Sequence, residues 1–289
     1  MKSPIFRGVC TALITPFLDG KINYPMAELL LKRQIENNVT AVVLAGTTGE
    51  SSTLSDDEKI KLFKRCKSYA GEHCKIIAGT GSNSTEHAVA LSIAAEKAGV
   101  DALLIVSPYY NKTTPEGLVQ HYISIANAVT IPIILYNVPS RTGLDIPVAV
   151  YKQLSILPNI VGVKEASSDI TKITRIRNEC PDDFYIWSGN DDQIVPVLSM
   201  GGCGVISVVS NVYPAETVAL TTSALSGDFR TAAEIQTRLA PLIELLFCEV
   251  NPIPVKEAMR LIGYDCGECR LPLVGLSSVN QHRLEVFFK

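Results

Sequence analysis

The chain carries the stretch IVGVKEA from Ile160 to Ala166, a short apolar run rich in β-branched residues. Such a continuous run is typical of a buried strand in a parallel sheet. Lys164 comes at its end, where desolvation disfavours the ammonium form and favours a neutral amine. A neutral amine can attack a carbonyl and form a Schiff base, although a lysine at a strand end can also simply reach the surface.

Seven further apolar runs of this kind flank that stretch. The starts of the eight runs are separated by about 19 to 34 residues, which leaves room for a helix between parallel strands. Eight strand–helix units predict an α/β fold of the (β/α)8 TIM-barrel type, with an open doubly wound sheet as the alternative. The other runs are Val9–Pro16, Ala41–Ala45, Lys75–Ala78, Ala102–Ser107, Ile131–Tyr136, Tyr185–Ser188 and Gly204–Ser210.

The segments between the runs carry helix signals. Ser55 precedes an acidic first turn, Pro115 follows a threonine suited to an N-cap, and Gly71 falls where a helix C-cap is expected. Met26 and Leu29 begin an apolar spacing that indicates an amphipathic helix over residues 26–35. We therefore expect helices to cover the predicted barrel.

Beyond Asn211 the pattern is helical through Phe288, with no further strand run. We expect a barrel over residues 1–225 and a C-terminal helical extension over residues 226–289 packed on it. The 289 residues are 47% hydrophobic and 19% charged, with a net charge of -3, as in an ordinary globular enzyme. There is no basic stripe for nucleic acid and no apolar run long enough for a membrane. Without a signal-peptide pattern at the N-terminus, we expect a cytoplasmic protein.

Eight cysteines are scattered along the chain, and only Cys266 and Cys269 form a C-x-x-C pair. A structural zinc site needs a second ligand pair, and a redox pair prefers a strand-to-helix context rather than the loop expected here. We interpret the pair as two spare surface thiols. The four histidines show no metal-ligand spacing either, so no metal is expected.

Polar side chains follow five of the predicted strands. In a barrel these carboxyl ends converge on one mouth, which is the usual place for an active site. Gly46 to Gly49 could form a plain turn or a cradle for an anion, Tyr136 could be a core aromatic, and Arg141 could be a surface charge or a carboxylate clamp. The five segments are Gly46–Ser51, Ser107–Asn111, Tyr136–Gly143, Lys164–Glu165 and Ser188–Asp191.

The motifs GTTGES, SPYYN, YNVPSRTG, VKEA, SGND and NPIPVK occur in that order over nearly the whole length. In this combination the chain resembles the 4-hydroxy-tetrahydrodipicolinate synthase (dihydrodipicolinate synthase) family of class I, Schiff-base aldolases. The resemblance implies a TIM barrel that condenses pyruvate with L-aspartate-4-semialdehyde in lysine and diaminopimelate biosynthesis. It also implies that no metal or organic cofactor is used, and that the enzyme is a homotetramer, a dimer of dimers.

The resemblance assigns roles residue by residue. Lys164 matches the Schiff-base lysine and Tyr136 the general acid/base. Thr48 and Tyr110 match the partners of a proton relay, with Tyr110 supplied by the neighbouring subunit. The matches for substrate binding are Thr47 and Arg141, which hold carboxylates, and Gly189 and Ile206, whose backbone carbonyls face the lysine pocket.

The resemblance also marks regulatory positions, because lysine-inhibited members bind free lysine near the first tyrosine of the pair, here Tyr109. Ser51 and Asn83 match positions of that site. His87 stands where a glutamate is expected, and Lys59 replaces a histidine. Both changes disfavour binding of a cation, so we predict weak or absent inhibition by L-lysine.

Two alternatives remain open at this point. A related aldolase, such as N-acetylneuraminate lyase or a 2-keto-3-deoxy sugar acid aldolase, would share Lys164 and Tyr136. Arg141 and Tyr110 favour the synthase, because the sugar-acid enzymes need room and hydroxyl-binding groups at the mouth. A non-catalytic barrel is disfavoured because both Lys164 and Tyr136 are present.

Overall fold

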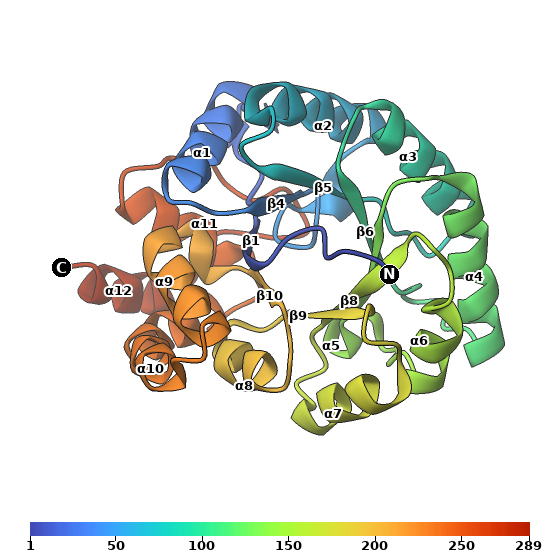
Figure 1. Cartoon of the computed structure of the whole chain (residues 1–289). Coiled ribbons are helices and arrows are strands. Elements are labelled where there is room, and N and C mark those ends of the chain that lie inside the picture. The colour runs from blue at the N-terminus through green and yellow to red at the C-terminus, as the bar shows by residue number, and fades with distance from the viewer.

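Eight parallel strands close into a barrel at the centre of the molecule (Figure 1). The computed structural model describes residues 1–289. Each strand pairs with its neighbour in the chain, and the first strand closes the ring by pairing with the last as well as with the second. The barrel strands are β1 (Gly8–Ala12), β4 (Ala41–Leu44), β5 (Lys75–Gly79), β6 (Ala102–Val106), β7 (Ile133–Asn137), β8 (Ile160–Glu165), β9 (Tyr185–Ser188) and β10 (Gly204–Ser207).

Helices surround the strand ring, as Figure 1 shows, which confirms the predicted TIM barrel and excludes the open sheet. They are α1 (Tyr24–Glu36), α2 (Asp56–Ala70), α3 (Thr85–Lys97), α4 (Pro115–Ala128), α5 (Pro139–Thr142), α6 (Val148–Leu154), α7 (Ile170–Glu179), α8 (Ile194–Ser199) and α9 (Pro214–Leu225), followed by α10 (Phe229–Leu246), α11 (Ile253–Leu261) and α12 (Ser278–Phe287). Short 3-10 turns are η1 (Ser51–Thr53), η2 (Asp191–Gln193) and η3 (Val209–Asn211). None of these helices combines the length and apolarity needed to cross a membrane.

The expected helix ends are confirmed. Ser55 caps α2 in a reciprocal capping box with Glu58, and Gly71 ends the helix with a positive φ of 54°. The expected amphipathic helix is present as α1, with Leu30 and Leu31 buried, although Leu29 is 44% exposed. A helix on the outside of a barrel buries only the stripe that meets the sheet, so apolar spacing alone does not fix its rotation.

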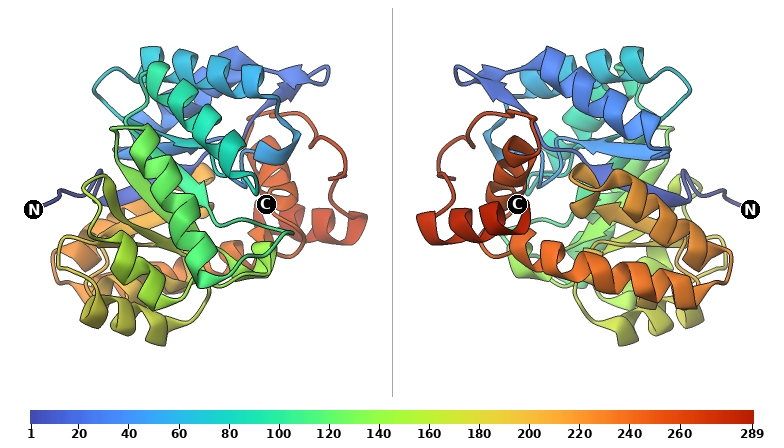
Figure 2. Two further views of the ribbon diagram at one scale, coloured as in Figure 1. Left: turned by 90° about the vertical axis from the view of Figure 1, so that its right-hand side faces the viewer. Right: turned by 90° about the vertical axis from the view of Figure 1, so that its left-hand side faces the viewer.

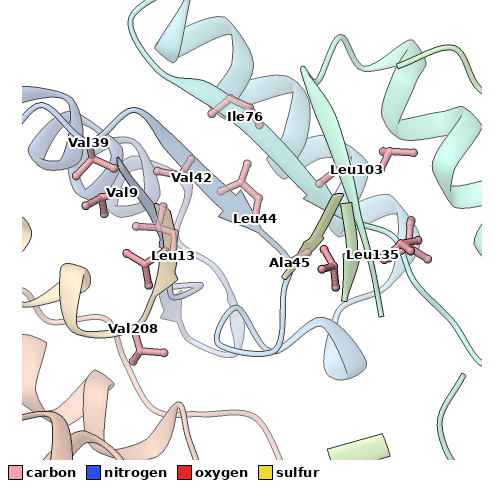
Figure 3. Packing of buried hydrophobic residues seen from close by; sticks show 14 of the residues in the cluster. Val9, Leu13, Val39, Val42, Leu44, Ala45, Ile76, Leu103, Leu135 and Val208 are labelled. Atoms are coloured by element: carbon pink, nitrogen blue, oxygen red, sulfur yellow. The ribbon is translucent and has the colours of Figure 1, made fainter. Parts of the chain in front are cut away.

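The core has two parts, as the strands alternate between inside and outside. A cluster of 67 buried residues fills the space between strands and helices, and Figure 3 shows part of it, including Val42 and Leu44. A smaller cluster of 16 buried residues fills the barrel interior and includes Ala41 and Val43 from the same strand. Successive residues of a strand therefore face the barrel interior and the surrounding helices in turn, as expected for a closed sheet.

Strand β8 breaks this alternation at one point. Its register against β7 shifts between Ile133 and Ile134, so that Gly162 rather than Val161 faces Ile134. Val161 belongs to the interior cluster, yet Val163, two residues later, belongs to the outer cluster. A β-bulge of this kind reverses the face of every later residue of the strand. As a result Lys164 is on the inner face.

Helices α11 and α12 lie on the side of the barrel opposite the N-terminus, and α10 runs along the barrel toward them (Figure 2). A buried ion pair joins Glu50, just after β4, to Lys256 of α11 at 2.6 Å. Arg270 reinforces the contact, since its guanidinium lies 2.6 Å from Glu58 and its backbone N–H donates to Glu50. The sequence pattern did not reveal the hairpin β2–β3 (Phe17–Leu18, Lys21–Ile22). The boundary at residue 226 stays a prediction.

Gly162→Ala is expected to destabilise the protein by about 2–3 kcal/mol or more, the upper range for overpacking. A Cβ added there would lie 2.0 Å from the backbone carbonyl oxygen of Tyr185, and neither strand can yield. The matched control is Gly275→Ala, where an added Cβ meets nothing within 4 Å. Denaturant unfolding measures both variants. Equal stability of the two would show that the bulge does not require glycine.

Candidate active site

A cavity of about 460 Å³ opens among the loops that follow the carboxyl ends of the first strands. Thr47, Tyr136 and Arg141 line it from the barrel, while Asn251 and Leu273 line it from the C-terminal extension. The extension therefore forms part of the site. This is the mouth at which TIM barrels carry their active sites.

Lys164 and Tyr136 form the centre of the site. They are register partners on β8 and β7, and the Lys164 Nζ lies 4.4 Å from the centre of the Tyr136 ring. Each side chain is only 6% exposed. Tyr136 lines the cavity, whereas Lys164 lies behind it and is not part of the cavity wall. The structure thus brings together the two residues that the resemblance assigns as Schiff-base lysine and general acid/base, and their roles stay a prediction.

The residues that follow these two on the strands hold the pair from outside the barrel. Asn137 donates from Nδ2 to Glu165 Oε1 over 2.7 Å. The hydroxyl of Tyr151 donates to Glu165 Oε2 over 3.0 Å, and burial raises the pKa of Tyr151 well above its usual range. Lys172 lies 3.7 Å from the same carboxylate oxygen. This buried network fixes the ends of β7 and β8, and hence the positions of the inward-facing side chains.

The Gly46–Ser51 segment is a tight turn. It is closed by hydrogen bonds from the Glu50 N–H to the Thr47 carbonyl (3.1 Å) and from the Ser51 N–H to the Gly46 carbonyl (3.2 Å). The N–H groups of Thr47 and Thr48 make no hydrogen bond within the protein. Both interpretations of this segment, as a turn and as an anion cradle, are therefore compatible with its backbone.

Asn251 links two of the predicted site residues, and sequence reasoning gave it no role. Its Nδ2 donates to the hydroxyl oxygen of Thr48 over 3.0 Å, and its backbone carbonyl accepts from Arg141 Nη2 over 3.3 Å. Arg141 itself is exposed on α5 at the cavity. The motif NPIPVK that contains Asn251 was visible in the sequence, but its contacts join residues about 110 and 203 positions apart.

Gly189 and Ile206 lie at the adjoining strands. A Cβ at Gly189 would come within 2.6 Å of the Ala166 side chain, so the loop after β9 packs tightly against the loop after β8. Ile206 is buried in the barrel interior. Neither residue lines the cavity.

The two tyrosines of SPYYN differ in surroundings. Tyr109 lines the cavity, but Tyr110 is 93% exposed and points to no site within its own chain. Its backbone has a φ of 70°, a left-handed conformation that non-glycine residues adopt at a cost. Within one chain, Tyr110 is not brought to Lys164.

The regulatory positions Ser51, Lys59 and His87 line the same cavity as the catalytic candidates, and Asn83 does not. The structure adds Asp56, whose carboxylate lies 2.8 Å from His87 Nε2 and 3.9 Å from Lys59 Nζ. Burial lowers the pKa of Lys59, and Asp56 opposes that shift. A carboxylate is thus present near these positions, although both neighbouring basic groups already engage it.

The interpretation of Cys266 and Cys269 as surface thiols is wrong. Cys266 is buried and Cys269 is half-buried in the loop between α11 and α12, and burial raises the pKa of each thiol to about 12. A loop that packs under the extension can bury side chains without regular secondary structure, which periodicity does not reveal. No group of three or more His, Cys, Asp or Glu side chains is arranged to hold a metal ion.

A buried lysine beside a tyrosine at the mouth of a TIM barrel suits the Schiff-base chemistry of an aldolase-type lyase. The sequence profile of the Dihydrodipicolinate synthetase family matches residues 5–289. The chain is 49% identical over 283 residues to the 4-hydroxy-tetrahydrodipicolinate synthase of Caldicellulosiruptor saccharolyticus, covering 98% of this chain and 96% of the relative. The chain belongs to the dihydrodipicolinate synthetase family.

Solved structures agree with this assignment. Dihydrodipicolinate synthase from Thermotoga maritima superposes with a TM-score of 0.96 at 43% identity, covering 98% of this chain and 97% of that one. The pyruvate complex of the chloride-inhibited enzyme from Acinetobacter baumannii superposes with a TM-score of 0.95 at 40% identity, covering 97% of each chain.

Proposed function

We propose that Lys164 is the residue on which this enzyme binds pyruvate, as an imine. The chain is an aldolase-type lyase of lysine and diaminopimelate biosynthesis that condenses pyruvate with L-aspartate-4-semialdehyde. The observation that supports Lys164 is its burial on the inner face of β8 with Nζ 4.4 Å from the Tyr136 ring centre. Attack of the amine on the pyruvate carbonyl expels water and gives the imine. Loss of a methyl proton then gives the enamine that attacks the aldehyde.

Proton transfer in these steps needs a group that gives and accepts protons without adding a fixed charge beside the amine. Tyr136 is next to Lys164, and Thr48 lies at the same mouth with its hydroxyl oxygen held by Asn251. We assign both to the relay, with Tyr110 as the third member. A positioned acid/base of this kind contributes roughly 10²- to 10⁴-fold to the rate.

The two substrate carboxylates need separate sites. Thr47 supplies a hydroxyl and an unpaired N–H in the turn beside the cavity, and we assign it to the pyruvate carboxylate. Arg141 supplies a guanidinium at the cavity, and we assign it to the carboxylate of the aldehyde. The backbone carbonyls of Gly189 and Ile206 complete the proposed lysine pocket.

Borohydride reduction in the presence of pyruvate is expected to add the reduced pyruvate mass to the peptide that contains Lys164. The reason is that only a desolvated amine at the site forms the imine in quantity. Mass mapping of a digest measures the modification, with the other buried lysines, Lys59, Lys172 and Lys256, as internal controls. Labelling of one of those lysines, or of none, would refute the assignment.

We also propose that the active unit contains more than one chain, within a cytoplasmic homotetramer. The supporting observation is that Tyr110 is 93% exposed and makes no contact with its own site. An aromatic side chain held outward in a left-handed backbone conformation suits insertion into a second copy. The relay would then be completed by the partner subunit.

Tyr110→Phe is expected to lower kcat at least tenfold without unfolding the chain, because only a hydroxyl is removed. Mixing this variant with Lys164→Ala should restore about a quarter of wild-type activity after random exchange, since half the dimers are hybrids with one intact site. Subunit exchange is verified by native mass spectrometry. Failure to recover activity after verified exchange would rule out a shared site.

Feedback by L-lysine should be weak. A bound lysine ammonium would need the Asp56 carboxylate, which already pairs with His87 and Lys59. We expect half-inhibition above about 1 mM, equivalent to binding weaker than about -4 kcal/mol. His87→Glu should strengthen inhibition roughly tenfold by adding a free carboxylate, whereas His73→Glu, on the exposed surface, should not. Initial rates with lysine titrated at fixed ionic strength decide this, and half-inhibition of the unaltered enzyme below 1 mM would contradict it.

The sugar-acid aldolase alternative is not favoured. The relatives that match nearly the full length are named as 4-hydroxy-tetrahydrodipicolinate synthases.

A further inference from the structure

We propose that the side-chain oxygen of Asn251 binds the α-amino group of the aldehyde substrate, and so selects L-aspartate-4-semialdehyde over aldehydes that lack the amine. This inference rests on the proposed function, in which Arg141 holds the carboxylate of the same substrate. It concerns a specificity-determining residue for which the sequence supplied no role.

The first argument is that Asn251 has an unpaired acceptor in a buried place. The residue is 4% exposed and lines the cavity. Its Nδ2 donates to Thr48, whereas its Oδ1 has no hydrogen-bond partner in the protein. A buried carbonyl oxygen without a donor costs free energy, which favours a ligand that donates to it. The oxygen is fully buried in the substrate-free structure, so the substrate ammonium reaches it when the Asn251 side chain turns toward the cavity.

The second argument is position. The Asn251 backbone carbonyl receives a hydrogen bond from Arg141, and its side chain reaches Thr48. The residue therefore spans from the proposed carboxylate clamp to the proposed proton relay. In L-aspartate-4-semialdehyde the amino group is on the carbon next to the carboxylate. We place the carboxylate on Arg141 and the aldehyde carbon toward Lys164. The carbon that bears the amino group then lies between Arg141 and Thr48, beside Asn251.

The third argument is that the other candidates for an ammonium are occupied. The acidic residues of the cavity wall are Glu50 and Asp56. Glu50 lies 2.6 Å from Lys256 and also accepts from the Arg270 N–H. Asp56 is engaged by His87 and Lys59. Among the fully buried side-chain oxygens of the cavity residues, that of Asn251 has neither a hydrogen-bond nor an ion-pair partner.

A neutral amide suits this task better than a third carboxylate would. An amide oxygen accepts a hydrogen bond from an ammonium without attracting every cation that enters the cavity. It also leaves the charge of Arg141 free for the substrate carboxylate. A site built to accept from a substrate N–H discriminates strongly against an analogue that lacks it, because the buried acceptor then stays unpaired.

The test compares L-aspartate-4-semialdehyde with succinic semialdehyde, which has the same carboxylate and aldehyde but no amino group. The measurements are KM and kcat for the natural aldehyde and the inhibition constant of succinic semialdehyde against it, which needs no turnover of the analogue. Borohydride trapping of pyruvate is run on every protein. Wild-type protein that fails to trap pyruvate on Lys164 would refute the proposed function itself, separately from the role of Asn251.

Two nearly isosteric variants separate the acceptor from the donor of the side chain. Asn251→Leu removes both, and it should lower kcat/KM for the natural aldehyde roughly 10- to 100-fold. The inhibition constant of succinic semialdehyde should change less than about threefold, because the analogue never used the oxygen. Asn251→Asp keeps an acceptor, so the KM for the natural aldehyde should not rise. The kcat should fall, because the Thr48 hydroxyl loses the Nδ2 donor and must donate its own proton to the new carboxylate.

Three outcomes would overturn the inference while pyruvate trapping stays intact. In the first, Asn251→Leu weakens both aldehydes in parallel, which would make Asn251 a positioning residue for Thr48 and Arg141. In the second, it changes neither. In the third, Asn251→Asp raises KM as much as Asn251→Leu does. Thermal unfolding checks the fold, and if the leucine variant does not fold, the aspartate variant alone still decides, since a raised KM contradicts the inference.

Discussion

The whole site depends on which face of β8 Lys164 occupies. Along a regular strand Lys164 would share the face of Gly162 and Ile160, and Ile160 belongs to the outer cluster. The bulge beside Gly162 reverses that parity and brings Lys164 against Tyr136. The bulge requires glycine because a Cβ at residue 162 would lie 2.0 Å from the Tyr185 carbonyl oxygen. The chemistry of the amine thus rests on one backbone irregularity.

The same reversal gives Glu165 its role. Once Lys164 faces inward, Glu165 must face the helices, where it is bonded to Asn137 and Tyr151. Successive residues on β7 and β8 therefore have different roles. Tyr136 and Lys164 face the barrel interior and form the site, whereas Asn137 and Glu165 face the helices and fix the ends of the two strands. The pattern explains why a charged residue can follow the catalytic lysine in a strand that is buried on both faces.

Much of the fold could be predicted from the sequence because the eight apolar runs are long, β-branched and evenly spaced. The bulge could not, because it depends on register between strands rather than on any single run. The apolar spacing predicted α1 but not the exposure of Leu29, since periodicity does not say how wide a stripe the sheet covers. Asn251 and Asp56 were missed for a similar reason. Their partners are brought to them only by the closed barrel and the extension.

The extension supplies Asn251 and Leu273 to a cavity whose other walls come from the barrel. The order of synthesis then matters, because residue 273 is among the last cavity residues to leave the ribosome. Side chains of α10 and α11 also belong to the cluster of 67 buried residues around the strand ring. The active site and the outer core are therefore both completed only when the extension has been synthesised.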